Sequence, residues 1–268
     1  MKRKTNKRAQ AIAAYWGKNL DEKNTWYDIQ ASNETTEIKI FDVIGWPFIE
    51  AFDFCSDLDK INTKNIKVNI NSPGGDVFDG IAIYNALLDH QAHVTTYVSG
   101  LAASMASIIA MAGAERQIAR SAFMMVHSPW AFSMGNADEM EKEAKILRKI
   151  ENTMADVYAL KTGKNQTQML QVMKDETWYT GQESVDAGFS EKICFDDKDQ
   201  KQAKFDLSMF SRAPAVAGET TKRQIERVLT QDAGLTRSQA RELMQNGYST
   251  ATDVQNTIKQ LIEKIRGN

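Results

Sequence analysis

A serine and a histidine stand in two short segments whose residue types could support nucleophilic chemistry. Ser104 lies in Gly-Leu-Ala-Ala-Ser-Met, and His127 lies further along the chain in Met-Val-His-Ser-Pro. A serine hydroxyl becomes an effective nucleophile when a neighbouring base takes its proton, and histidine is the commonest such base. The two segments therefore predict a nucleophile and its general base.

A glycine turn lies upstream of both, in the segment Asn-Ser-Pro-Gly-Gly-Asp that ends at Asp76. Attack of a serine on a carbonyl creates an oxyanion, which preorganised N–H groups must stabilise. Adjacent glycines allow unusual backbone angles and a close approach of substrate. We expect the N–H groups of Gly75 and Met105 to form this oxyanion hole. The extended residues beside the turn could also pair with a peptide by strand addition.

A catalytic triad needs a third member, a carboxylate that orients the imidazole and stabilises its charged form. Asp175 and Glu176 both precede Trp178 in a strand-like stretch. From the residues alone, either carboxylate could reach the histidine. At least one of the two is then an ordinary solvated acid at a loop.

Each of these residues also has a purely structural interpretation. Ser104 could be a serine in a buried alanine-rich helix, and His127 could be a structural histidine at the end of a strand. Ser99 and Ser107 are weaker candidates for the nucleophile, because one belongs to the preceding strand and the other lies further into the helix. The occurrence of serine, histidine and glycine turn together favours a serine peptidase.

Alternating strands and helices are expected to position these groups. Residue patterns typical of strands cover 26–31, 37–44, 66–70, 93–98 and 117–127. Helical spacing of apolar residues covers 48–58, 77–88, 102–111, 136–160 and 166–173, and a last helix and strand span 183–194. Gly100 is expected to break a strand shortly before Ser104. Alternation of this kind indicates βαβ units with largely parallel pairing, which is an α/β fold.

The expected domain organisation places the chemistry in one central domain. It comprises an N-terminal arm (1–25), a peptidase-like domain (26–200), a linker (201–218) and a helical C-terminal tail (219–268). The long helix over 136–160 has one apolar stripe and a charged opposite face. Such a stripe suits burial against another copy of the chain or against the helix's own domain.

Composition excludes several other classes of function. A net charge of -2 gives no electrostatic case for nucleic acid, and no apolar run approaches the length of a membrane span. Two cysteines without metal-ligand spacing indicate a reducing cytoplasm and no metal site. The segment 162–165 partly matches a phosphate-binding loop but lacks its leading glycine and the hydroxyl residue after the lysine. We therefore expect no cofactor.

Taken together, these motifs resemble the proteolytic subunit of the Clp protease, a family of self-compartmentalising serine peptidases. The resemblance covers roughly residues 38–195. It rests on Asn-Ser-Pro-Gly-Gly, Ala-Ala-Ser-Met, Met-Val-His-Ser-Pro and Trp-Tyr-Thr-x-x-Glu-Ser-x-x-x-Gly, in that order. It implies a crotonase-like ββα spiral that assembles into rings, with the helix over 136–160 as the handle through which two rings meet.

The resemblance also implies roles for single residues. The family's nucleophile falls on Ser104, its base on His127 and its oxyanion donors on Gly75 and Met105. The position of the family's aspartate is taken by Glu176, which is a departure from the family pattern.

Two further departures are Ala106, where the housekeeping enzymes carry glycine, and the helical tail after about Lys204. They look more like the phage and prophage branch of head maturation proteases, which are thought to trim scaffold or capsid protein inside the prohead without an ATPase partner. The resemblance thus implies a ring-forming endopeptidase acting on polypeptide in the host cytoplasm or prohead. The alternatives are a housekeeping-type subunit fed by an ATP-dependent unfoldase, a crotonase-type acyl-CoA enzyme, and a catalytically silent scaffold.

Overall fold

The structure of the chain is a computed structural model. It describes residues 26–45, 47–48, 50–131 and 133–194, and in addition residues 13, 205, 207, 210–214 and 230. The chain divides into two compact units, Met1–Phe205 and Asp206–Asn268. The expected arm, linker and tail lie almost wholly outside the described residues.

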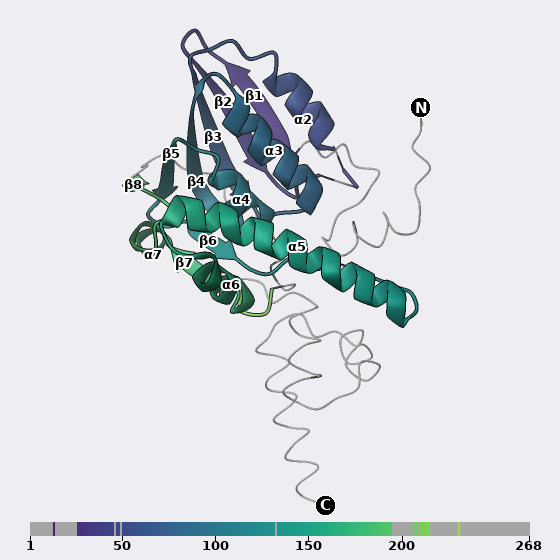
Figure 1. Ribbon diagram of the computed structural model, residues 1–268. Coiled ribbons are helices and arrows are strands. Elements are labelled where there is room, and N and C mark those ends of the chain that lie inside the picture. The colour runs from purple at the N-terminus through teal and green to yellow at the C-terminus, as the bar shows by residue number, and fades with distance from the viewer. Residues whose placement is uncertain are drawn as a thin grey trace, which may run out of the picture. The chain divides into compact units, whose positions relative to one another are not determined.

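A mixed β-sheet forms the centre of the described residues (Figure 1). Its strands are β1 (Tyr27–Ala31), β2 (Thr35–Phe41), β3 (Asn65–Ser72), β4 (His93–Ala103), β5 (Glu115–Ala119), β6 (Phe123–Val126), β7 (Thr177–Thr180) and β8 (Lys192–Cys194). They follow the order β1-β2-β3-β4-β5-β8, with β6 beside β4 and β7 beside β6. The pairs β1–β2 and β6–β7 are antiparallel, and the others are parallel. The expected α/β fold with largely parallel pairing is confirmed.

The described helices that follow the strands are α2 (Ala51–Leu58), α3 (Val77–Asp89), α4 (Met105–Ala110), α5 (Ala137–Thr162), α6 (Gln166–Lys174) and α7 (Gly181–Asp186). Helices α2, α3 and α4 pack side by side over the sheet, and α5 crosses beside them (Figure 1). Capping boxes at Asn136 and Asn165 begin α5 and α6, and Gly163 ends α5 in the left-handed conformation.

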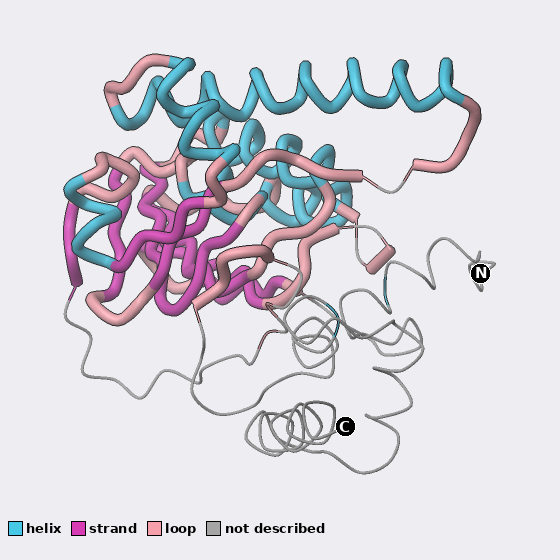
Figure 2. Tube along the Cα trace, turned by 90° about the horizontal axis from the view of Figure 1, so that it is seen from below, coloured by secondary structure: helices cyan, strands magenta, loops and turns pink. Residues whose placement is uncertain are grey.

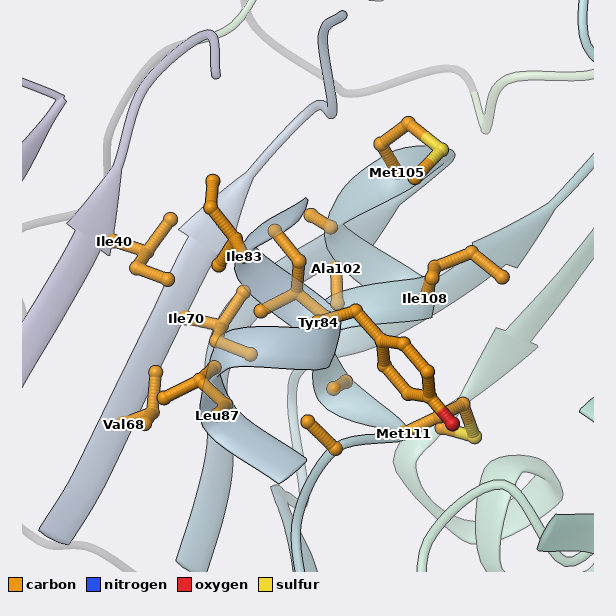
Figure 3. Close-up of a cluster of buried hydrophobic side chains, with 14 of the residues drawn as sticks. Ile40, Val68, Ile70, Ile83, Tyr84, Leu87, Ala102, Met105, Ile108 and Met111 are labelled. Carbon is orange, nitrogen blue, oxygen red and sulfur yellow. The ribbon is translucent and has the colours of Figure 1, made fainter. Parts of the chain in front are cut away.

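The core between the sheet and these helices reaches up to the residues around Ser104. Ile40, Val68 and Ile70 come from the strands, and Ile83 and Leu87 come from α3 (Figure 3). The same cluster contains the residues on either side of the β4–α4 turn, namely Ala102, Met105, Ile108 and Met111. The turn that carries the candidate nucleophile is therefore fixed by the main hydrophobic core.

Two local expectations differ from the structure. Strand β4 continues through Gly100 to Ala103, so the helix begins at Met105 and not at residue 102. The cause is pairing, because residues 101–103 form a parallel ladder with β6 and lie buried in the sheet. The stretch 117–127 is two strands, since β5 ends at Ala119 and a turn at Arg120 precedes β6.

Helix α5 has two halves with different surroundings. Its C-terminal half buries Met154, Ala155 and Tyr158 against its own domain. Its N-terminal half, from Ala137 to Ile146, is exposed and extends beyond the strands (Figure 2). The C-terminal half thus packs as a domain helix, and the exposed half carries the exposed Met140 of the apolar stripe.

Candidate active site

Ser104 occupies the sharp turn between β4 and α4. Its backbone has φ 53 and ψ -125, a conformation that residues other than glycine rarely adopt. Its N–H donates to Met125 O of β6 at 3.0 Å. The neighbours Ala103 and Met105 are fully buried, whereas Ser104 is partly exposed. The strained turn therefore presents the serine side chain outward from a rigid core.

His127 follows β6 directly and is brought to Ser104 by strand pairing. Strands β4 and β6 run parallel with Ala103 opposite Met125, so both chains leave the sheet at the same edge. His127 Nε2 lies 2.8 Å from Ser104 Oγ. This is a hydrogen bond between a hydroxyl and an imidazole, the contact that a serine nucleophile and its base require.

Burial sets the protonation state of this histidine. The residue is 7% exposed, and desolvation lowers the pKa of His127 to about 4, although the Glu176 carboxylate acts in the opposite direction. At neutral pH the imidazole is therefore uncharged. A neutral ring can accept the serine proton, and a nearby carboxylate stabilises the imidazolium that then forms.

Glu176 lies opposite His127 because of the pairing between β6 and β7. The antiparallel register places Val126 opposite Thr177, so the next residue on each strand, His127 and Glu176, are neighbours at the end of the ladder. Glu176 adopts a left-handed conformation with φ 47, and its Oε1 accepts from Trp178 Nε1 at 3.3 Å. The tryptophan thus holds the carboxylate near the end of the strand ladder that His127 follows.

Asp175, the other carboxylate considered for this role, has different surroundings. It caps the end of α6, and its Oδ2 accepts from Gln171 Nε2 on the exposed side of that helix at 2.9 Å. The charged group that acts on the pKa of His127 is Glu176. The geometry therefore favours Glu176 as the orienting carboxylate.

The glycine turn packs directly on the serine. A Cβ added to Gly74 would lie 2.7 Å from Ser104 Cβ and 3.0 Å from Met105 N, and its φ of 99 is itself unfavourable for side chains. Ser72 Oγ accepts from Gly74 N–H at 3.1 Å and donates to Asp42 O, which anchors the turn. Only glycine fits at this contact.

The N–H of Gly75 points away from Ile44, the residue that pairs with the glycine turn. Ile44 bonds the two neighbours of Gly75: its N–H donates to Gly74 O, and its C=O accepts from Asp76 N–H, each at 2.9 Å. Because successive residues of an extended chain bond to opposite sides, Gly75 presents its own N–H to the other edge. On the other flank of the turn, Met105 N lies 3.0 Å from where a Cβ of Gly74 would stand, next to Ser104.

One contact beside the histidine was not expected from the sequence. Ser128 Oγ donates to Glu151 Oε1 of α5 at 2.5 Å, and Ser128 N–H donates to Met173 O of α6 at 3.0 Å. These bonds fix the chain immediately after His127. Glu151 lies on the charged face of its helix, and no local pattern distinguishes it from its exposed neighbours.

Neither a metal centre nor a membrane span is found in the part of the chain that the structure describes. No three His, Cys, Asp or Glu side chains there gather as metal ligands would, and no helix there is long and apolar enough to cross a bilayer.

Comparison with known proteins identifies the family of this chain. The family model for Clp protease matches residues 54–197, more than half of the chain and all of the described site from the glycine turn to Glu176. The chain belongs to the Clp protease family. Its mixed sheet and helices are accordingly those of a Clp protease domain, and the relatives in this family are serine peptidases.

Several curated relatives carry the name ATP-dependent Clp protease proteolytic subunit. Subunit 1 of Protochlamydia amoebophila is 35% identical over 134 residues, which cover 48% of this chain and 65% of the relative. The protein of Deinococcus radiodurans is 32% identical over 51% of this chain and 68% of the relative. That of Bacteroides fragilis is 31% identical over 51% and 67%. The chain thus spans about two thirds of the length of the relatives it matches.

Proposed function

We propose that the protein is a serine endopeptidase that cleaves polypeptides through an acyl-enzyme on Ser104. The observation that carries this proposal is the 2.8 Å contact of Ser104 Oγ with the neutral, buried His127, beside a glycine turn that admits no side chain. The strained backbone of Ser104 supports it, because strain of this kind is retained mainly at functional sites.

The reaction follows from the positions of these groups. His127 takes the proton of Ser104 as the hydroxyl attacks the peptide carbonyl, and Glu176 stabilises the resulting imidazolium. The N–H groups of Gly75 and Met105 bind the oxyanion. The imidazolium then protonates the leaving amine, and a water molecule activated by the same imidazole hydrolyses the acyl-enzyme.

A fluorophosphonate probe tests this proposal. We expect covalent labelling at Ser104, detected by peptide mass spectrometry, and loss of peptide cleavage by about 10⁶-fold in Ser104→Ala. Ser99→Ala is the matched control, because Ser99 is also on β4 but bonds the Ile70 carbonyl, and it should leave labelling intact. Labelling elsewhere, or none, would support a crotonase-type enzyme or a silent scaffold.

For the biological setting, we propose head maturation of a phage or prophage, in a ring of identical subunits in the host cytoplasm or the prohead. Support comes from the three departures from the housekeeping pattern, which are Glu176, Ala106 and the residues that follow the matched range at 197. Against it stand the names of the relatives, which describe ATP-dependent subunits.

Cleavage assays separate these two settings. The purified protein alone should cleave the capsid or scaffold protein encoded by its neighbouring genes, with a portal gene upstream and a major capsid gene downstream. A requirement for ATP and a stable complex with an unfoldase would instead assign it to the housekeeping type.

A further inference from the structure

A buried chain of hydroxyl groups connects α5 with the backbone of the nucleophile. Ser107 of α4 and Tyr158 of α5 are both fully buried, and Ser107 Oγ lies 2.8 Å from the Tyr158 hydroxyl. Ser107 Oγ also lies 2.5 Å from the carbonyl oxygen of Ser104. Buried hydroxyl groups are costly unless they are hydrogen-bonded, and these two satisfy each other within an apolar core.

The direction of this chain follows from its chemistry. The Ser104 carbonyl oxygen can only accept hydrogen bonds, so the single hydroxyl proton of Ser107 must be donated to it. Tyr158 is then the donor to Ser107 Oγ. Burial raises the pKa of Tyr158, which keeps its hydroxyl protonated. The order is therefore Tyr158 O–H to Ser107 Oγ, and Ser107 O–H to Ser104 O.

The carbonyl that receives this bond belongs to the same peptide unit as the N–H of Met105. A peptide unit is planar, and its C=O and N–H point in opposite directions. The Ser104 carbonyl also accepts from Ser107 N–H at 2.9 Å, so one residue holds it twice. When the Ser104 carbonyl oxygen is held in place, the orientation of the Met105 N–H on the opposite side of the same peptide unit is held as well.

We propose that Ser107 and Tyr158 are positioning residues that orient the Met105 N–H as an oxyanion donor. This inference rests on the proposed peptidase function and assigns to α5 a part in transition-state stabilisation. Neither residue touches the substrate. They act on the reaction through the Ser104–Met105 peptide unit. Ser107 bonds the carbonyl of this unit, and Tyr158 in turn bonds Ser107.

Two substitutions test the chain link by link. Ser107→Ala removes the bond to the Ser104 carbonyl and should lower kcat by about 10- to 100-fold, less than loss of a whole oxyanion donor. Tyr158→Phe keeps the ring, which packs edge-on against Phe189, and leaves the Ser107 bond in place, so it should cost about 2- to 10-fold. The double variant should be no slower than Ser107→Ala, because both act through one bond.

The measurements must distinguish positioning from general stability. We expect KM to stay within about 3-fold, and a peptide aldehyde, which forms an oxyanion at the serine, to bind more weakly in proportion to the loss of kcat. Tyr84→Phe is the matched control, since it removes the hydroxyl of another buried tyrosine of the core and should leave kcat unchanged. A rise in KM alone, or equal losses in Tyr84→Phe, would overturn the inference.

A crystal structure of Ser107→Ala gives a readout that does not depend on activity. We expect the Ser104–Met105 peptide unit to rotate, and an unchanged peptide unit overturns the inference. If the wild-type protein neither cleaves peptides nor reacts with a fluorophosphonate, the proposed function fails. If the wild type is active and both variants equal it, the positioning role alone fails.

Discussion

The two ends of the candidate triad are held in different ways. Ser104 stands between fully buried neighbours, with its N–H bonded to β6, its carbonyl bonded to Ser107 and Gly74 packed on its side chain. Glu176 stands at a half-buried turn between α6 and β7, in a left-handed backbone conformation of its own. The candidate nucleophile is thus fixed by the core, whereas the candidate acid is fixed by strand register and one turn.

The strongest test of this contrast is at the acid itself. Glu176→Gln keeps the size of the side chain but removes the charge that stabilises the imidazolium, so kcat should fall by about 10³- to 10⁴-fold. Asp175→Asn is the matched neighbour and should change kcat by less than about 3-fold, because its carboxylate bonds Gln171. Steady-state cleavage of a fluorogenic peptide measures both. A larger loss in Asp175→Asn would assign the third position to that residue.

The nucleophile end should tolerate no added atom. In Gly74→Ala the new methyl would lie 2.7 Å from Ser104 Cβ, so the turn must move and kcat should fall by about 10²- to 10³-fold. Gly163→Ala provides the control, because Gly163 has a similar left-handed φ of 71 but no atom within 4 Å of the added Cβ.

That control should lose about 1 kcal/mol of unfolding free energy and keep its activity. Thermal unfolding and peptide cleavage together measure the difference. Equal activity in the two variants would show that Gly74 is not needed at the serine.

The smallest effect is expected in the pH profile. The proposed mechanism requires neutral His127, so kcat/KM should stay level from pH 7 to 5 and decline as the pH falls through about 4. The charge of Glu176 raises the pKa of His127, so Glu176→Gln should move this midpoint to lower pH. A midpoint near 6.5, the value of an ordinary exposed histidine, would contradict the burial argument.

The same shift affects stability. An unfolded histidine binds a proton near pH 6.5, but buried His127 does not until about pH 4. The unfolded state therefore binds more protons in this window, and the free energy of unfolding should decrease as the pH falls from 6.5 to 4. Circular dichroism over this range separates unfolding from loss of the base.

Much of this architecture follows from the sequence because apolar periodicity and turn residues report local structure. The alternation in β3 and the helical spacing in α3 and α5 have direct counterparts. The extent of β4 could not be predicted, since its last residues are alanines that favour helix, and only pairing with β6 makes them a strand. The break after β5 has no glycine or proline to mark it.

In the candidate site, too, some features follow from local sequence and others only from tertiary packing. Ser104, His127 and the glycine turn carry short motifs, and the structure brings them together. The choice between Asp175 and Glu176 depends on one left-handed residue and one strand register, neither of which local spacing encodes. The bond between Ser107 and Tyr158 joins residues 51 positions apart, and only the packing of α4 against α5 determines it.

The shared strand β6 has a consequence for how the protein could be switched off. His127 follows β6 and Glu176 precedes β7, and the antiparallel pairing of these two strands keeps the candidate base and acid side by side. This pair meets the serine through a ladder of only three residue pairs between β4 and β6. Separation of β6 from β4 would move His127 and Glu176 away from Ser104 together. The histidine and the glutamate would stay paired, and the serine hydroxyl would lose its base. An inactive form of the enzyme should therefore be recognised by a widened gap between Ser104 and His127, with the histidine still beside its glutamate.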